Sequence, residues 1–163
     1  MTLTERFAAE LAEVDGEAHL VDSREQALAE VRTLVGDAPV VIDHDPDLEG
    51  AAEGLKVVDD PWQAELGLTS AVAAVAETGT LALVCDRDRA RSTSLVPPVH
   101  VALVSQGRLV ATFADAVDRL AGLRPTPSGM YFITGPSHSG DIELTLVRGV
   151  HGPREVHVIL YAI

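Results

Sequence analysis

The chain has 163 residues, a length typical of one domain, and its hydrophobic fraction of 47% argues against a disordered protein. The formal net charge of −13 argues against nucleic acid as a partner, because phosphate binding relies on basic surfaces. No apolar run is long enough for a membrane span, and the single cysteine, Cys85, excludes an internal disulfide and multi-cysteine metal clusters. We therefore expect a soluble, cytoplasmic protein with no membrane partner.

The charge is distributed unevenly along the chain. Residues 1–70 contain 17 acids and four bases, whereas residues 71–163 contain eight of each. We interpret the acidic part as a solvated face and expect any anion site in the second part. The whole chain is treated as a single domain, with an acidic helix and strand segment over 1–67 and a motif-bearing segment over 68–163.

Hydrophobic periodicity in the first segment predicts two helices and several short strands. Apolar residues at helical spacing favour a helix over 4–14. A second helix begins after Ser23, where Ser23 and Gln26 fit a capping box, and ends at Gly36. The other elements expected here are strands over 18–21, 39–42 and 55–58 and a connecting helix over 61–66.

The second segment has more β character. Two apolar runs flank a turn at 77–80 and predict an antiparallel hairpin near residues 71–85. Strands interleaved with helices indicate an α/β fold, a sandwich around a mostly parallel sheet. The further elements are an arginine-rich loop over 86–94, strands over 100–104, 108–110, 130–134 and 155–162, and helices over 113–120 and near Asp141.

The first candidate site is centred on Glu77. This carboxylate lies between two apolar strands and precedes Gly79 in a tight turn. Such a turn can project the side chain into a cleft, where it would serve in acid–base or nucleophilic chemistry. The alternative is a glutamate that only accepts hydrogen bonds from backbone amides. The spacing leaves both interpretations open.

The second candidate is the loop over 135–141, which follows an apolar strand. Ligands of α/β proteins gather beyond the carboxyl ends of strands, and helix N-termini offer free amides to anions. The loop contains the glycine and serine residues needed to wrap a carboxylate or phosphate, but it matches no nucleotide-binding fingerprint. An ordinary loop in which Ser or Asp caps a helix is the equal alternative.

Histidines and arginines of the second segment are interpreted more conservatively. His100, His138 and His151 are each expected to act as structural hydrogen-bonding residues. No pair of them has the helical spacing of a metal site, so no metal is assigned. The loop over 86–94 carries three alternating arginines, Arg87, Arg89 and Arg91. They could close over an anionic substrate, but a solvated loop is the favoured interpretation.

Four motifs of the second segment occur together in a distinctive order. They are AETGT at 76–80, LVPPVH at 95–100, GPS at 135–137 with DIE at 141–143, and GVHGPRE at 149–155. In this order and spacing the chain resembles, over residues 68–163, the LUD domain family of lactate-utilisation protein C. The resemblance implies the three-layer α/β fold of the NagB/RpiA/CoA-transferase-like superfamily.

The resemblance also implies a function and a site. Proteins of this kind belong to a three-protein system that oxidises L-lactate to pyruvate, in which two partner proteins carry iron–sulfur clusters. This chain is then expected to bind no cofactor itself and to take a small carboxylate or another anionic ligand. The implied site has Glu77 as its catalytic residue and, as ligand-binding residues, Thr78, Gly79, Thr80, His100, Gly135, Pro136, Ser137, Asp141, Glu143 and His151.

Two other functions stay open at this point. CoA-transferases of the related superfamily use a glutamate near a Gly-rich turn, so the chain could be an independent enzyme that acts on a CoA thioester or a phosphorylated small molecule through Glu77. It could also be a non-catalytic assembly or regulatory module that docks through its acidic first segment. The sequence does not decide whether the chain is an enzyme by itself.

Overall fold

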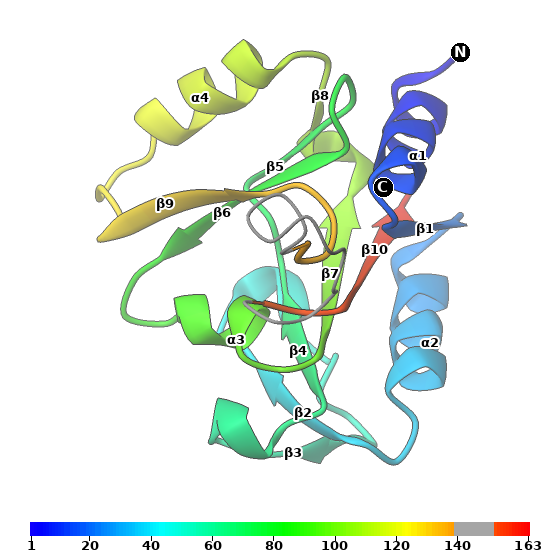
Figure 1. The fold of residues 1–163 in the computed structure, drawn as a ribbon, viewed down its shortest axis with the longest axis vertical. Helices are drawn as coiled ribbons and strands as arrows, with labels where there is room; N and C mark the ends of the chain where they lie inside the picture. The colour runs from blue at the N-terminus through cyan, green and yellow to red at the C-terminus, as the bar shows by residue number, and fades with distance from the viewer. Residues whose placement is uncertain (139–151) are drawn as a thin grey trace.

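The computed structural model describes residues 1–138 and 152–163, and within them the chain forms two β-sheets with helices around them (Figure 1). The larger sheet has six strands, and every neighbouring pair in it is parallel. In spatial order these strands are β1 (Glu17–Val21), β10 (Glu155–Tyr161), β7 (Val99–Ser105), β4 (Leu66–Thr69), β2 (Pro39–Ile42) and β3 (Lys56–Val57).

The smaller sheet has four strands and mixed pairing. Its spatial order is β8 (Leu109–Val110), β5 (Ala73–Val75), β6 (Thr80–Cys85) and β9 (Gly129–Ile133). Strands β5 and β6 form the predicted antiparallel hairpin, β9 adds to it antiparallel, and β8 adds to it parallel. The predicted α/β fold with a mostly parallel sheet and an antiparallel hairpin is therefore confirmed, and the hairpin is the centre of a separate sheet.

Four α-helices and three short 3₁₀ helices complete the described part of the chain. Two of the helices begin where local capping predicts: the side chains of Ser23 and Thr112 accept hydrogen bonds from backbone amides three residues later. The α-helices are α1 (Leu3–Glu13), α2 (Arg24–Val35), α3 (Arg91–Leu95) and α4 (Phe113–Ala121). The 3₁₀ helices are η1 (Pro46–Leu48), η2 (Pro61–Gln63) and η3 (Gln106–Arg108). None of the helices in the described residues is long and apolar enough to cross a membrane.

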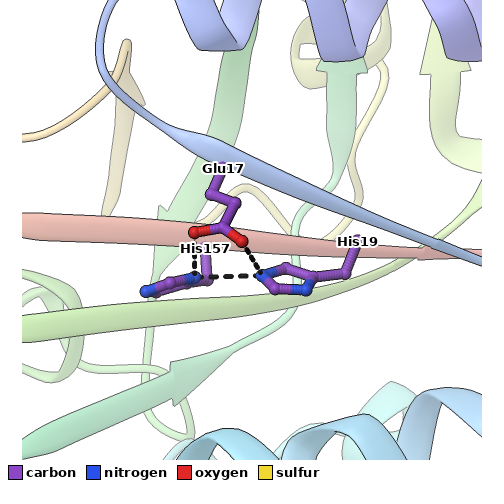
Figure 2. Close-up of side chains that lie close together, drawn as sticks. All are labelled: Glu17, His19 and His157. Carbon is purple, nitrogen blue, oxygen red and sulfur yellow. Dashed lines mark hydrogen bonds and ion pairs between the residues drawn. The ribbon is translucent and has the colours of Figure 1, made fainter.

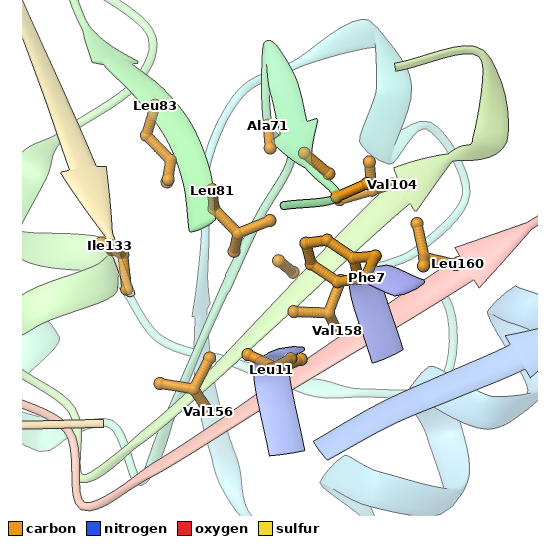
Figure 3. Close-up of a cluster of buried hydrophobic side chains, with 13 residues drawn as sticks. Phe7, Leu11, Ala71, Leu81, Leu83, Val104, Ile133, Val156, Val158 and Leu160 are labelled. Atoms are coloured by element: carbon orange, nitrogen blue, oxygen red, sulfur yellow. The ribbon is translucent and has the colours of Figure 1, made fainter. Parts of the chain in front are cut away.

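Three apolar cores hold these layers together. One lies between α2 and the larger sheet, and another lies between the smaller sheet and α4. The third fills the space between the two sheets and includes Phe7 and Leu11 of α1, each at most 1% exposed (Figure 3). Helix α1 is thus a component of the central core.

Two expectations about the chain path are wrong. The connecting helix expected over 61–66 is only the short turn η2, and the strand β4 follows it. In β4, a Cβ on Gly67 would overlap the carbonyl oxygen of Thr93, so α3 packs directly on this strand. The loop expected over 86–94 ends in α3 itself. The helix expected near Asp141 lies outside the described residues.

Candidate functional site

The turn at 77–80 joins β5 to β6 and packs against α1. Gly79 has a φ of 65°, and a Cβ there would lie 2.5 Å from the backbone nitrogen of Leu11. Only glycine fits both the left-handed backbone and this close approach. The hydroxyl of Thr78 donates to Oγ1 of Thr80 at 2.8 Å. The conformation of the predicted turn is therefore fixed by the first helix and by its own side chains.

Glu77 attaches the same turn to a second helix. Its Oε1 accepts a hydrogen bond of 2.6 Å from the backbone amide of Phe113, the first residue of α4. A carboxylate in this place satisfies an amide that has no partner within the helix and interacts favourably with the helix dipole. The backbone amide of Glu77 donates to the carbonyl oxygen of Ala111 at 3.2 Å. These contacts match the structural alternative for Glu77, and its catalytic role stays a prediction.

The loop that starts at Gly135 also lies against the C-terminal end of α1. Gly135 has a φ of 72°, and a Cβ there would collide with the carbonyl oxygen of Val14, the C-cap residue of α1. Just before it, the hydroxyl of Thr134 lies 2.7 Å from that of Thr80. The structure thus brings two of the predicted motifs together, with α1 as their common support.

The next two residues of this loop, Pro136 and Ser137, lie beside the segment that leads into β10. Pro136 is buried, and the backbone amide of Ser137 donates to the carbonyl oxygen of Pro153 at 2.9 Å. This hydrogen bond joins the described part of the loop to the segment just before the last strand. Three predicted site residues, Asp141, Glu143 and His151, lie outside the described residues.

His100 belongs to the larger sheet, on β7. It is fully buried, and its Nε2 lies 2.8 Å from Oγ1 of Thr69. Burial lowers the pKa of His100 to about 4, so the ring is neutral at physiological pH. Its Nδ1 is buried and has no hydrogen-bond partner among the described residues. One ring nitrogen thus has the structural hydrogen bond that the sequence suggested, while its ligand-binding role stays a prediction.

A polar cluster that the sequence analysis did not predict lies where β2 and β4 end. Asp43 directly follows β2, and Ser70 directly follows β4. The hydroxyl of Ser70 donates to Oδ2 of Asp45 at 2.6 Å, and Nη1 of Arg89 lies 3.4 Å from the same oxygen. Carboxyl ends of parallel strands meet at one edge of a sheet, so residues from three separate segments converge here. We call Asp43, Asp45, Ser70 and Arg89 the polar-edge cluster.

Asp43 is the buried acid of the polar-edge cluster. Its side chain is 9% exposed and accepts a hydrogen bond of 3.3 Å from the backbone amide of Ala90. Burial raises the pKa of Asp43 to about 6, although hydrogen bonds from Thr93 and Ala90 act in the opposite direction. A carboxyl group with a pKa close to neutral pH can both accept and donate a proton.

Two cavities open beside the polar-edge cluster. One has a volume of about 230 Å³ and is lined by Arg89 and Arg108, the latter paired with Asp47 at 3.0 Å. The other, of about 210 Å³, is lined by Asp43 and Thr93. A guanidinium carries five N–H donors, so each arginine can bind an acceptor besides its aspartate. The first cavity therefore presents arginine N–H donors beside the carboxylates of Asp45 and Asp47, which also line it.

The arginines of the loop over 86–94 play different roles. Arg89 is held by Asp86 and Asp45, so it is not the freely solvated side chain that the sequence suggested. The guanidinium carbon of Arg91 lies 5.6 Å from the ring centre of Tyr131.

The sequence contained one signal for the polar-edge cluster, an acidic run after the apolar strand at 39–42. That run could not be interpreted as part of a site, because its neighbour β4 was not predicted.

The described residues also contain one group with the composition of a metal site, formed by Glu17, His19 and His157 (Figure 2). The two histidines are separated by 138 residues in the sequence and meet only because β1 pairs with β10. The spacing of histidines in the sequence therefore did not indicate this group. Glu17 and His157 lie near the amino ends of their strands, at the opposite edge of the sheet from the polar-edge cluster.

The fold and the polar-edge cluster define an α/β protein with a cavity lined by arginine and aspartate side chains at the carboxyl ends of parallel strands. Residues 56–161 match the model of the LUD domain, and the chain belongs to this family. The matched part includes β4, the hairpin, and Arg89 and Arg108 of the first cavity. Helices α1 and α2 precede it.

Curated relatives agree with this assignment. A lactate utilization protein C of Bacillus subtilis is 38% identical over 114 residues, which are 68% of this chain and 48% of the relative. One of Halalkalibacterium halodurans is 39% identical over 105 residues, covering 62% of this chain and 46% of the relative. One of Anoxybacillus flavithermus is 32% identical over 152 residues, which cover 83% of this chain and 67% of the relative. The chain spans about half the length of the first two of these relatives.

A solved structure has the same fold. A DUF162 family protein from Deinococcus radiodurans superposes with a TM-score of 0.74 over 98% of this chain and 96% of that one, at 23% identity. Because the superposition includes nearly all residues, helices α1 and α2 are part of the common fold.

Proposed function

We propose that this chain is a component of an L-lactate utilisation system and that it binds a small carboxylate in the cavity between Arg89 and Arg108. The relatives named lactate utilization protein C support the first part. The observation that carries the second part is the pair of arginines from two separate segments that line one cavity of about 230 Å³. Drug-sized ligands occupy larger pockets, so this volume favours a molecule of few atoms.

The chemistry of the polar-edge cluster fits a hydroxy acid or a keto acid. Guanidinium groups bind carboxylates with paired hydrogen bonds, and Arg89 and Arg108 offer such donors. Asp43, with a pKa of about 6, lies near Arg89 but lines the neighbouring cavity, so we assign it no direct contact with the ligand. We propose that electrons leave through iron–sulfur partner proteins, and that this chain holds no cluster.

The alternative of a CoA-transferase-like enzyme depends on a free Glu77 carboxylate. In the described residues this carboxylate accepts a hydrogen bond from the first amide of α4. No observation favours the alternative over lactate utilisation. The assembly-module alternative differs in that it needs no ligand, so it is separated from our proposal by a binding measurement.

Binding of L-lactate and of pyruvate to the purified chain, measured by titration calorimetry, tests the proposal. We expect saturable binding of one of them, and at least about tenfold weaker binding after Arg108→Gln, because a hydrogen bond to a charged group contributes about 1.5–3 kcal/mol. The control is Arg32→Ala, since Arg32 is an exposed arginine on α2. Equal affinity of the wild type and Arg108→Gln would reject this cavity as the site.

A genetic experiment tests the wider role. Deleting the gene that encodes the chain should impair growth on L-lactate but not on glucose, and the wild-type gene should restore it. Pull-down from lactate-grown cells should recover iron–sulfur proteins. Unimpaired growth of the deletion strain on L-lactate would contradict the proposed system.

A further inference from the structure

Three side chains from the first and last strands point at one place on the larger sheet (Figure 2). Glu17 and His19 lie on β1, and His157 lies on β10 directly opposite Glu17. Nε2 of His19 is 3.0 Å from Nδ1 of His157, and each of these nitrogens is 3.6 Å from an oxygen of Glu17. Two imidazoles and one carboxylate therefore face a common point.

Each histidine uses its other ring nitrogen to contact a further carboxylate. Nδ1 of His19 lies 3.1 Å from Oε1 of Glu30 on α2, and Nε2 of His157 lies 3.2 Å from Oε2 of Glu155. Metal-binding histidines are held in this way, because a carboxylate behind the ring fixes its orientation and makes the facing nitrogen a better ligand.

The two ring nitrogens that face each other are arranged to share a cation. When each histidine donates its ring hydrogen toward the glutamate behind it, the lone pairs on Nε2 of His19 and Nδ1 of His157 face each other at 3.0 Å. A metal ion at the common point would bind both lone pairs.

The surrounding charge favours a divalent metal ion over a single proton. Three carboxylates, those of Glu17, Glu30 and Glu155, surround the two rings. A proton would neutralise one of these negative charges, whereas a divalent ion neutralises two and also takes Glu17 as a third ligand. Tetrahedral zinc bonds of about 2.0–2.1 Å place ligand atoms about 3.3 Å apart, close to the separations found here.

We propose that Glu17, His19 and His157 form a binding site for a divalent transition metal ion of the zinc type. The side chains of His19 and His157 are 15% and 13% exposed, whereas that of Glu17 is 65% exposed, so the site is anchored in the sheet and open toward solvent. A cavity of about 530 Å³, lined by His157, Glu155 and Arg154, adjoins it and gives room for an external fourth ligand.

This site is independent of the proposed carboxylate cavity, because it lies at the amino ends of the parallel strands. Its test uses the untagged full chain, Zn²⁺ in competition with a chromophoric chelator, and Co²⁺ followed by visible absorption. We expect one ion per chain. Glu17→Gln and His19→Ala should each abolish the Co²⁺ bands, and Glu30→Gln should weaken Zn²⁺ binding by about tenfold through loss of the carboxylate behind His19.

The matched control is His44→Ala, which removes an exposed histidine remote from the three ligands in the sequence and should leave the affinity unchanged. Glu17→Gln alters an exposed side chain, so loss of binding in this variant cannot be attributed to unfolding, and circular dichroism of each variant verifies the fold. The proposal is overturned if the wild type takes up neither ion, or if Glu17→Gln and His19→Ala bind Zn²⁺ as the wild type does.

Discussion

Two buried ionisable side chains, Asp43 and His100, have pKa values that burial displaces in favour of the neutral form. The two pKa shifts make the stability of the fold depend on pH in opposite directions. Asp43, with its pKa raised to about 6, stabilises the fold in its protonated form, and this contribution is lost as pH rises from about 4 to 6. His100, with its pKa lowered to about 4, contributes stability that is lost as pH falls from about 6.5 to 4.

The substitution Asp43→Asn tests the cost of holding this carboxylate. We expect it to raise the free energy of unfolding by about 1–3 kcal/mol at pH 8, where Asp43 is ionised, and to change it little at pH 4. The contribution of His100 is the same in both proteins and cancels in the difference. Urea denaturation at the two pH values measures the effect, with the exposed Asp37→Asn as control. A gain of equal size at both pH values would contradict the assignment.

The sequence pointed to His100 but not to Asp43. His100 was identified through a motif, which is a local pattern. Asp43 owes its raised pKa to burial, and its hydrogen bonds come from residues 90 and 93, about 50 positions away. No pattern near residue 43 contains this information, so the chemically unusual member of the polar-edge cluster became visible only in three dimensions.

At the scale of elements, the starts of two capped helices were predictable, whereas helix α3 and strand β4 were not. Ser23 and Thr112 cap their helices because the capping interaction lies within three residues. Strand β4 has four residues, one of them Gly67, and gives only a weak strand pattern. Its glycine is required by the packing of α3 on the sheet, which is a tertiary contact.

The turn at Gly79 gives a matched pair of substitutions. Gly79 and Gly54 both have a positive φ, but a Cβ on Gly79 would meet the backbone of α1, whereas a Cβ on Gly54 would meet nothing within 4 Å. We expect Gly54→Ala to cost about 1 kcal/mol from backbone conformation alone. Gly79→Ala should cost about 3 kcal/mol or more, because the turn must also move away from α1. Guanidinium unfolding curves compare the two, and equal costs would show that the contact with α1 is not rigid.

On the scale of the whole molecule, the parallel sheet followed from the order of strands and helices, whereas the second sheet did not. Its pairings join β6 to β9 and β5 to β8, and only the hairpin between β5 and β6 is local. The place of α1 in the fold was not predicted either, since the helical spacing over 4–14 indicated an apolar face but not what that face packs against. In the structure its apolar side fills the space between the sheets (Figure 3).

A substitution in α1 should therefore affect the stability of the whole molecule. Phe7 is completely buried, and Phe7→Ala is expected to cost about 3–5 kcal/mol by opening a cavity between the sheets. Leu3→Ala on the same helix is the control, because Leu3 is 43% exposed and its loss should cost about 0.5 kcal/mol or less. Thermal and urea unfolding followed by circular dichroism measure both, and similar small costs would show that α1 is dispensable to the core.

The parallel pairing of β1 with β10 has a mechanical consequence. Glu17 pairs with His157 and Val21 with Tyr161, so the backbone enters β1 and leaves β10 at opposite ends of the pair. Tension applied between Gly16 and Ala162 then acts as shear along the two strands. The backbone hydrogen bonds between β1 and β10 then bear the force together instead of breaking one after another. Force applied at these two points therefore does not peel the edge strand β1 from the sheet.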